Sequence, residues 1–286
     1  MRVLFLLPHP DDESALCPVT LLKLVRAGHD VTVCLATSDE YGVEPRGGVE
    51  ADRFKGHRMR RIRVAEMYAA ARAYGVDERG KFGFTVAWLG FVDGHLLVNR
   101  EARDRVVELL RRKRPDAFVS TDPFFPLDFH PDHVNVGLLA LLAVRKLPVA
   151  ERPRLFFVQS FRPDHFQPFR REEARVAWQA FGEHRSQVSP LTLKLFNAAR
   201  WFYFFVVGRG RAGRPAEGFR LARLEAERGP ERFRDVVVWH AMRRNGVSNP
   251  RLYRPTPEEL GLRVRPLEEF DGTRPRRPPA GRPTGP

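Results

Sequence analysis

The feature that most constrains this fold is the start of the chain, where an apolar run meets a cluster of proline, histidine and acidic residues. Arg2–Leu7 is almost wholly aliphatic, and Pro8–Ser14 contains one histidine and three consecutive acidic residues. An apolar run of this length that stops at a proline is typical of a strand buried on both faces of a parallel sheet. In open α/β sheets the ligand crevice lies outside the carboxyl ends of such strands. The sequence therefore predicts an α/β fold with a functional cluster directly after its first strand.

A second polar cluster follows another strand-like run, Ala117–Ser120. His130 and His133 are three residues apart at the start of a helical apolar pattern, so their rings fall on one face of the first turn. Two imidazoles and one carboxylate hold a catalytic zinc while leaving a position open for water. A pair of histidines at this spacing is often purely structural, but two complementary clusters after buried strands favour a metal site.

The segments after the first loop predict a Rossmann-like arrangement. Leu16–Ala27 has helical apolar spacing and is ended by Gly28, and Asp30–Ala36 alternates as a second strand. No glycine-rich dinucleotide fingerprint follows the first strand, which argues against a nicotinamide cofactor. We expect a three-layer α/β sandwich with a mostly parallel central sheet, extra C-terminal helices and a Pro/Arg-rich tail.

The two clusters carry a resemblance to a known family. Pro8–Glu13 and His130–His133 resemble the paired signatures of the LmbE-like family, which includes the PIG-L de-N-acetylases and the deacetylases of mycothiol and bacillithiol synthesis. Further blocks resemble the family in the right order, and the resemblance extends over roughly residues 2–225. These blocks are Gly28–Val31, Arg63–Glu66, Asp93–Gly94, His184–Gln187 and Ala216–Arg220.

The resemblance implies zinc-dependent hydrolysis of the N-acetyl amide of an N-acetylglucosamine-type substrate. His9, Asp12 and His133 are the expected ligands of Zn²⁺ or of another divalent metal. Asp11 lies next to a ligand and is the candidate general base. Two alternatives remain open: a metal-dependent hydrolase of a non-sugar or lipid-linked amide or ester, and a non-catalytic metal-binding protein on the same scaffold.

The resemblance also implies roles for four further residues. A protonated His130 is expected to donate to the oxyanion, and Asp132 to accept from its other ring nitrogen. Arg63 and Asp93 are expected to bind the substrate, Asp93 through a sugar hydroxyl. Taken by themselves, Arg63 is also an ordinary surface charge and Asp93 an ordinary turn residue before glycine.

The net charge and the distribution of basic residues indicate which classes of binding partner to expect. The formal net charge is +14 and the isoelectric point about 10.7, yet the arginines are spread along the chain without a nucleic-acid-binding motif. We expect a small N-acetylated sugar or glycoconjugate as the partner and no nucleic acid. A lipid-linked substrate, contact with a membrane surface and a homo-oligomer remain open. Nothing before the first strand resembles a signal peptide, so the expected location is the cytoplasm.

The chain is expected to divide into three parts: a deacetylase domain at 1–225, a helical extension at 226–248, and an extended or disordered Pro/Arg-rich tail at 249–286. Within the domain, Trp201–Val207 is the most apolar run. It is too short and too interrupted to span a bilayer, and both a buried core segment and an interfacial segment remain open.

Overall fold

The computed structural model describes residues 1–42, 55–125, 130–160, 162–212, 214–225 and 256–273. Their centre is one eight-stranded sheet in the order β6-β7-β5-β4-β1-β2-β3-β8. Strands β1 to β5 pair in parallel, and β6, β7 and β8 join antiparallel at the two edges. The strands are β1 (Arg2–Leu7), β2 (Asp30–Thr37), β3 (Thr85–Phe91), β4 (Ala117–Thr121), β5 (Arg154–Val158), β6 (His165–Pro168), β7 (Ala216–Leu221) and β8 (Glu268–Phe270).

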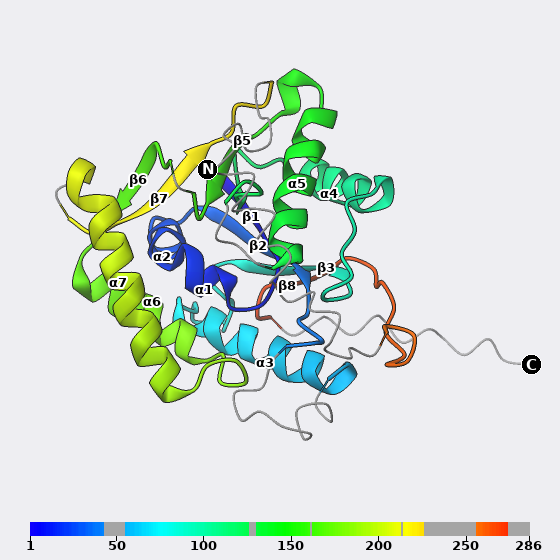
Figure 1. Ribbon diagram of the computed structural model, residues 1–286, viewed down its shortest axis with the longest axis horizontal. Coiled ribbons are helices and arrows are strands. Elements are labelled where there is room, and N and C mark those ends of the chain that lie inside the picture. Colours follow the sequence, from blue (N-terminus) through cyan, green and yellow to red (C-terminus); the bar gives the residue numbers. More distant parts are fainter. Residues whose placement is uncertain (43–54, 126–129, 161, 213, 226–255, 274–286) are drawn as a thin grey trace, which may run out of the picture.

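Helices cover both faces of the sheet, so the predicted three-layer architecture is confirmed (Figure 1). One face carries α4 and α5, and the other carries α2, α3 and α6, with α7 packed outside α6 and β7. The helices are α1 (Asp12–Leu16), α2 (Pro18–Arg26), α3 (His57–Ala73), α4 (Arg100–Lys113), α5 (Pro131–Lys146), α6 (Arg171–Gly182) and α7 (Pro190–Ala212), with a 3₁₀ turn at Val149–Glu151.

The central strands are buried on both faces because each lies between two layers of helices. Along β1, Leu4 and Leu6 belong to the core under α4 and α5, while Val3 and Phe5 belong to the core under α2 and α3. Successive side chains of a strand point to opposite faces, so a strand between two helical layers must be apolar throughout. This explains the unbroken aliphatic run at the start of the chain.

The strand order brings the polar clusters together. Strand β1 lies between β4 and β2, and β3 lies beside β2, so the segments after these four strands meet at one edge of the sheet. Pro8 and the first cluster follow β1, and His130 caps α5 after β4. The segments that begin at Ser38 and Val92 follow β2 and β3. This shared carboxyl edge is where the sequence predicts the site.

Two local boundaries differ from the sequence expectation. The helix predicted at 16–27 corresponds to α2 and starts only at Pro18, because the backbone breaks at Cys17, after the short α1. Proline can begin α2 because its missing N–H costs nothing at that position. The short apolar run Phe84–Leu89 predicts a strand that ends at Leu89. Strand β3 instead continues through Phe91, and the carbonyl of Gly90 accepts from the backbone N–H of Arg265, in the C-terminal part of the chain, at 2.8 Å.

The predicted C-terminal tail needs a correction in one part. Within 249–286, residues 256–273 pack on the domain, and Glu268–Phe270 forms the edge strand β8 beside β3. The frequent prolines and charges of this part predict an extended or disordered tail, but one short strand and buried apolar residues such as Leu262 hold residues 256–273 on the domain. The predicted helical extension at 226–248 lies outside the described residues.

The aromatic run in α7 is divided between core and surface. Phe204 is buried against Val19 and Phe169, whereas Phe202 and Val206 are exposed. The core interpretation therefore holds for one side of the helix, and the other side presents apolar groups to solvent. Among the described residues, no helix is both long and apolar enough to cross a membrane.

Candidate active site

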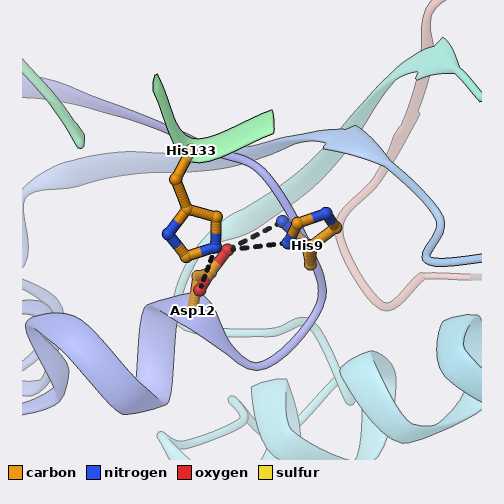
Figure 2. A group of neighbouring side chains, drawn as sticks. All are labelled: His9, Asp12 and His133. Carbon is orange, nitrogen blue, oxygen red and sulfur yellow. Dashed lines mark hydrogen bonds and ion pairs between the residues drawn. The ribbon is translucent and has the colours of Figure 1, made fainter. Parts of the chain in front are cut away.

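Three side chains predicted as metal ligands converge at the carboxyl edge. His9, Asp12 and His133 each offer one ligand atom, and these atoms lie within 4.8 Å of one another. Figure 2 shows the Asp12 carboxylate between the two imidazoles. It lies 3.6 Å from Nδ1 of His9 and 3.5 Å from Nε2 of His133. Two imidazole nitrogens and a carboxylate oxygen in a nearly buried position fit a divalent cation such as zinc.

The charge state of Asp12 suits a cation ligand. Burial alone would raise its pKa, but the nearby rings of His133 and His9 outweigh burial and lower the pKa to about 2. Its Oδ2 also accepts from the backbone N–H of His9 at 2.8 Å. The carboxylate is therefore ionised at neutral pH, and its position at the start of α1 is fixed.

His9 is oriented by two carboxylates on the ring nitrogen that faces away from Asp12. Its Nε2 lies 3.1 Å from Oδ1 of Asp93 and 3.4 Å from Oδ2 of Asp132. Burial lowers the pKa of His9, but the hydrogen bonds to Asp12, Asp132 and Asp93 together raise it well above 6.5. A metal bound at Nδ1 would take the place of the Nδ1 proton, while Nε2 would keep its proton and donate it to these carboxylates.

Asp93 and Asp132, which the sequence assigns to a substrate hydroxyl and to His130, both contact His9 instead. Asp93 is buried, with one oxygen on His9 and the other accepting from the backbone N–H of Tyr41 at 3.1 Å. The Asp132 carboxylate accepts from the backbone N–H of Gly94 at 2.7 Å. The contact of Asp132 with His130 is made by the Asp132 backbone N–H, which donates to Nδ1 of His130 at 3.3 Å. The expected carboxylate contact between Asp132 and His130 is therefore replaced by a backbone contact. Substrate binding by Asp93 stays a prediction.

His130 is placed to donate through its other ring nitrogen. Because Nδ1 accepts from the Asp132 backbone, a neutral ring carries its proton on Nε2. Burial and the neighbouring rings of His9 and His133 lower the pKa of His130 to about 3. A neutral ring with this orientation can donate an Nε2–H, and the protonated ring expected from the sequence stays a prediction.

Asp11 has an unusual backbone conformation beside the ligands. Its φ is 107°, outside the ordinary range for a residue with a side chain. Its backbone N–H donates to Oε2 of Glu13 at 3.0 Å, and its carboxylate accepts from Nη2 of Arg63 at 2.7 Å. Arg63 Nη2 also donates to the carbonyl of Pro10. Positive φ at a non-glycine residue persists only where its surroundings enforce it, and these contacts do so.

Arg63 lies beneath Asp11 and has no exposed surface. Its Nε is 2.6 Å from Oδ2 of Asp39, and its Nη1 donates to Glu66 at 2.9 Å. Three carboxylates therefore surround one buried guanidinium, which is the pairing a buried charge requires. A direct contact between Arg63 and substrate stays a prediction. The contacts of Arg63 in the structure are with the candidate base Asp11 and with the neighbouring carboxylates of Asp39 and Glu66.

Sequence reasoning gave no role to the histidine and glutamate behind this arginine. His184 and Glu13 are fully buried and lie 3.2 Å apart through Nε2 and Oε1. Nδ1 of His184 is 3.4 Å from Nη1 of Arg63, and Ser186 donates to Glu66 from both its backbone and its hydroxyl. The signal was present in the block His184–Gln187, but its partners are far away in the sequence.

Comparison with known proteins agrees with this geometry. The family profile described as PIG-L, GlcNAc-PI de-N-acetylase, matches residues 4–144. The chain is similar to the diacetylchitobiose deacetylase of Thermococcus kodakarensis, with 28% identity over 77% of this chain and 82% of that one. It is also similar to the 1D-myo-inositol 2-acetamido-2-deoxy-alpha-D-glucopyranoside deacetylase of Mycolicibacterium paratuberculosis, with 32% identity over 46% of this chain and 48% of that one.

Among solved structures, the N,N'-diacetylchitobiose deacetylase of Pyrococcus horikoshii has a similar fold. The TM-score is 0.68 with 25% identity, over 82% of this chain and 88% of that one. Coverage thus differs among relatives: this chain spans most of the diacetylchitobiose enzymes but about half of the inositol-glycoside deacetylase.

Proposed function

Since the chain belongs to the PIG-L family of de-N-acetylases, which are amidohydrolases, we propose that it hydrolyses the N-acetyl amide of an N-acetylglucosamine-type substrate with the help of a divalent metal. The products would be acetate and a free amine. The observation that carries this proposal is the juxtaposition of a metal-type ligand set with a carboxylate held beside it. Asp11 lies in the same loop as His9, immediately before Asp12 in the sequence. Arg63 fixes the side chain of Asp11 through a hydrogen bond.

The proposed metal is Zn²⁺, held by His9, Asp12 and His133. A metal ion in such a site supplies Lewis acidity to the acetyl carbonyl and makes a water molecule acidic enough to attack at neutral pH. The mixed nitrogen and oxygen donor set favours zinc over calcium or magnesium, which prefer oxygen ligands alone.

The chain's own residues would handle the protons and the developing charge. Asp11 accepts the proton of the attacking water and later delivers it to the departing amine nitrogen. His130, neutral and protonated on Nε2, donates to the oxygen of the acetyl carbonyl as negative charge develops there. A metal-binding protein without catalysis has no use for a base and a donor beside its metal, so the pair argues against the non-catalytic alternative.

The substrate class follows from the relatives. Diacetylchitobiose and an inositol glycoside of N-acetylglucosamine, named for two of them, share a sugar that carries an acetamido group, and we infer the same group for this chain.

A lipid-linked amide is the second candidate, because the outer side of α7 is apolar. Leu191, Leu195, Phe202 and Val206 are more than half exposed, and contiguous exposed apolar groups mark sites of interaction with other apolar surfaces. Such a face would suit a substrate presented from a lipid surface.

The test is release of acetate and amine from a panel of substrates. The panel holds N-acetylglucosamine, its phosphorylated and lipid-linked forms, and N-acetylated chitooligosaccharides, each with chelated enzyme and with zinc restored. Zinc-dependent acetate release from soluble sugars supports the proposal, and release from the lipid-linked form alone favours the second candidate. A protein that binds zinc but releases no acetate from any member would overturn the sugar substrate.

A further inference from the structure

Residues 256–273, here called the C-terminal segment, lie beyond the family match at 4–144 and yet reach the active-site edge. Strand β8 in this segment pairs antiparallel with β3 (Figure 1, orange). Just before β8, the backbone N–H of Arg265 donates to the carbonyl of Gly90 at 2.8 Å. The segment therefore extends the sheet next to the strand that leads to Asp93.

The contact at Gly90 is too close for any other residue. A Cβ at Gly90, whose φ is +80°, would meet the carbonyl oxygen of Arg265 at 2.4 Å. Arg105 of α4 links β3 to the C-terminal segment, since its Nη1 donates to the carbonyls of Leu89 at 2.8 Å and of Arg265 at 2.7 Å. Leu262 is buried with Tyr41 and Val92. The C-terminal segment is therefore built into the domain.

The side chain of Arg265 turns inward, toward the loop after β2. Its Nη2 donates to Oγ of Ser38 at 2.6 Å and lies 3.6 Å from Oε1 of Glu40. Glu40 is only 1% exposed. Burial and the Asp93 carboxylate raise the pKa of Glu40, and the Arg265 guanidinium is the nearby cation that opposes this shift.

Glu40 in turn holds Asp93, the residue behind a candidate metal ligand. Oε2 of Glu40 accepts from the backbone N–H of Asp93 at 3.2 Å. The Asp93 carboxylate is fixed by the backbone of Tyr41 and contacts Nε2 of His9 at 3.1 Å. The line of contacts thus runs from Arg265 through Glu40 and Asp93 to His9.

We propose that Arg265 is a positioning residue for the metal site, and that the C-terminal segment is a functional part of the active site. The inference rests on the proposed function, because it takes His9 as a metal ligand. Arg265 pairs with the buried carboxylate of Glu40, Glu40 fixes the backbone of Asp93, and Asp93 orients His9. Partners that hold a ligating histidine typically change metal affinity by about 10-fold to 100-fold when they are removed.

The experiment compares zinc affinity in the full chain and in two matched variants. Arg265→Met keeps the aliphatic stem and removes the charge, while Arg263→Met removes an equal charge from an exposed position two residues away. Zinc alone is titrated at neutral pH against a chelating indicator, well below the unfolding temperature of each protein. We expect Arg265→Met to weaken zinc binding about tenfold and Arg263→Met to leave it unchanged. With saturating zinc, KM for the acetylated sugar should be the same in all three proteins, because the proposal assigns Arg265 to the metal site and not to substrate binding.

A second pair of variants keeps the proposal falsifiable if Arg265→Met folds poorly. Arg265→Lys retains a cation and should lose less zinc affinity than Arg265→Met. Glu40→Gln added to Arg265→Met removes the unpaired buried charge and should recover part of the loss. Equal zinc affinity in the wild type and the Arg265 variants, with only a lower melting temperature, would overturn the proposal and leave Arg265 a stabilising contact.

The two proposals fail differently. A wild-type protein that binds no zinc would reject the metal site and this inference together. A wild-type protein that binds zinc and releases acetate, with unchanged affinity in the Arg265 variants, would reject this inference alone.

Discussion

Arg63 donates to the carboxylate of Asp11 at 2.7 Å from a position that has no exposed surface. The same guanidinium donates to the carbonyl of Pro10, so it fixes both the side chain and the backbone next to the candidate base. The positive φ of Asp11 shows that the loop is held in a conformation that its own sequence does not favour. The base is therefore positioned by a residue of α3, more than fifty positions away in the sequence.

Asp11→Ala should keep zinc and lose turnover. The side chain is not among the three that converge as ligands, and a general base typically contributes about 10²- to 10⁴-fold to rate. Zinc content by elemental analysis and kcat for acetate release together check this. Loss of bound zinc in the variant would show that Asp11 is a ligand and not the base.

Arg63→Lys should fold, retain zinc and lose kcat. Lysine keeps the positive charge among Asp11, Asp39 and Glu66 but cannot reproduce the planar set of donors. We expect kcat to fall about 10-fold to 100-fold because the base is displaced. The matched control is Arg61→Lys on the exposed side of α3, which should behave as wild type. A rise in KM with unchanged kcat would favour the substrate-binding role expected from the sequence.

His130→Ala should also retain zinc, because the three proposed ligands, His9, Asp12 and His133, stay in place. The loss of one donor to an oxyanion typically lowers kcat by about 10²- to 10³-fold. Steady-state kinetics at saturating zinc measure the effect. Unchanged kcat would rule out the oxyanion role.

Stability of the metal-free protein should fall as the pH drops from about 6.5 toward 3, and His130 should account for part of this fall. Burial and the rings of His9 and His133 lower the pKa of His130 from 6.5 to about 3. Between these two pH values the unfolded chain binds a proton at His130 and the folded protein does not. Each such proton costs up to about 1.4 kcal/mol per pH unit. Urea unfolding of chelated protein at several pH values should give a flatter profile for His130→Asn than for wild type. Parallel profiles for wild type and His130→Asn would contradict the lowered pKa.

Gly137→Ala should destabilise the protein, because α5 crosses β4 at van der Waals contact. A Cβ at this position would meet the carbonyl oxygen of Thr121 at 2.4 Å, so α5, which carries His133, would have to move away. Overpacking of this kind typically costs about 1–3 kcal/mol, measured as the free energy of unfolding. Gly182→Ala in α6 is the control, since its added Cβ would meet Leu193 at an ordinary 3.4 Å. Equal stability of the two variants would show that the α5 contact can relax.

Local sequence determined the parallel sheet and the place of the site. A strand between two helical layers must be apolar on both sides, and this requirement is visible in Arg2–Leu7 without any knowledge of its neighbours. The prolines and polar residues that end the strand mark its carboxyl edge, and the spacing of His130 and His133 marks the first turn of a helix. These signals are local, so the fold class and the meeting of the two clusters were predictable.

Tertiary structure alone decided which partner each charged group has. Asp132 turns its carboxylate to His9 instead of His130, and Arg63 lies beneath Asp11. Arg265 reaches Glu40 from a segment whose composition predicts an extended or disordered tail. A buried charge takes the partner that packing brings within a few ångströms, and such partners stand tens to hundreds of positions apart in the chain. Periodicity encodes which face of an element is buried, but not which distant side chain will meet it there.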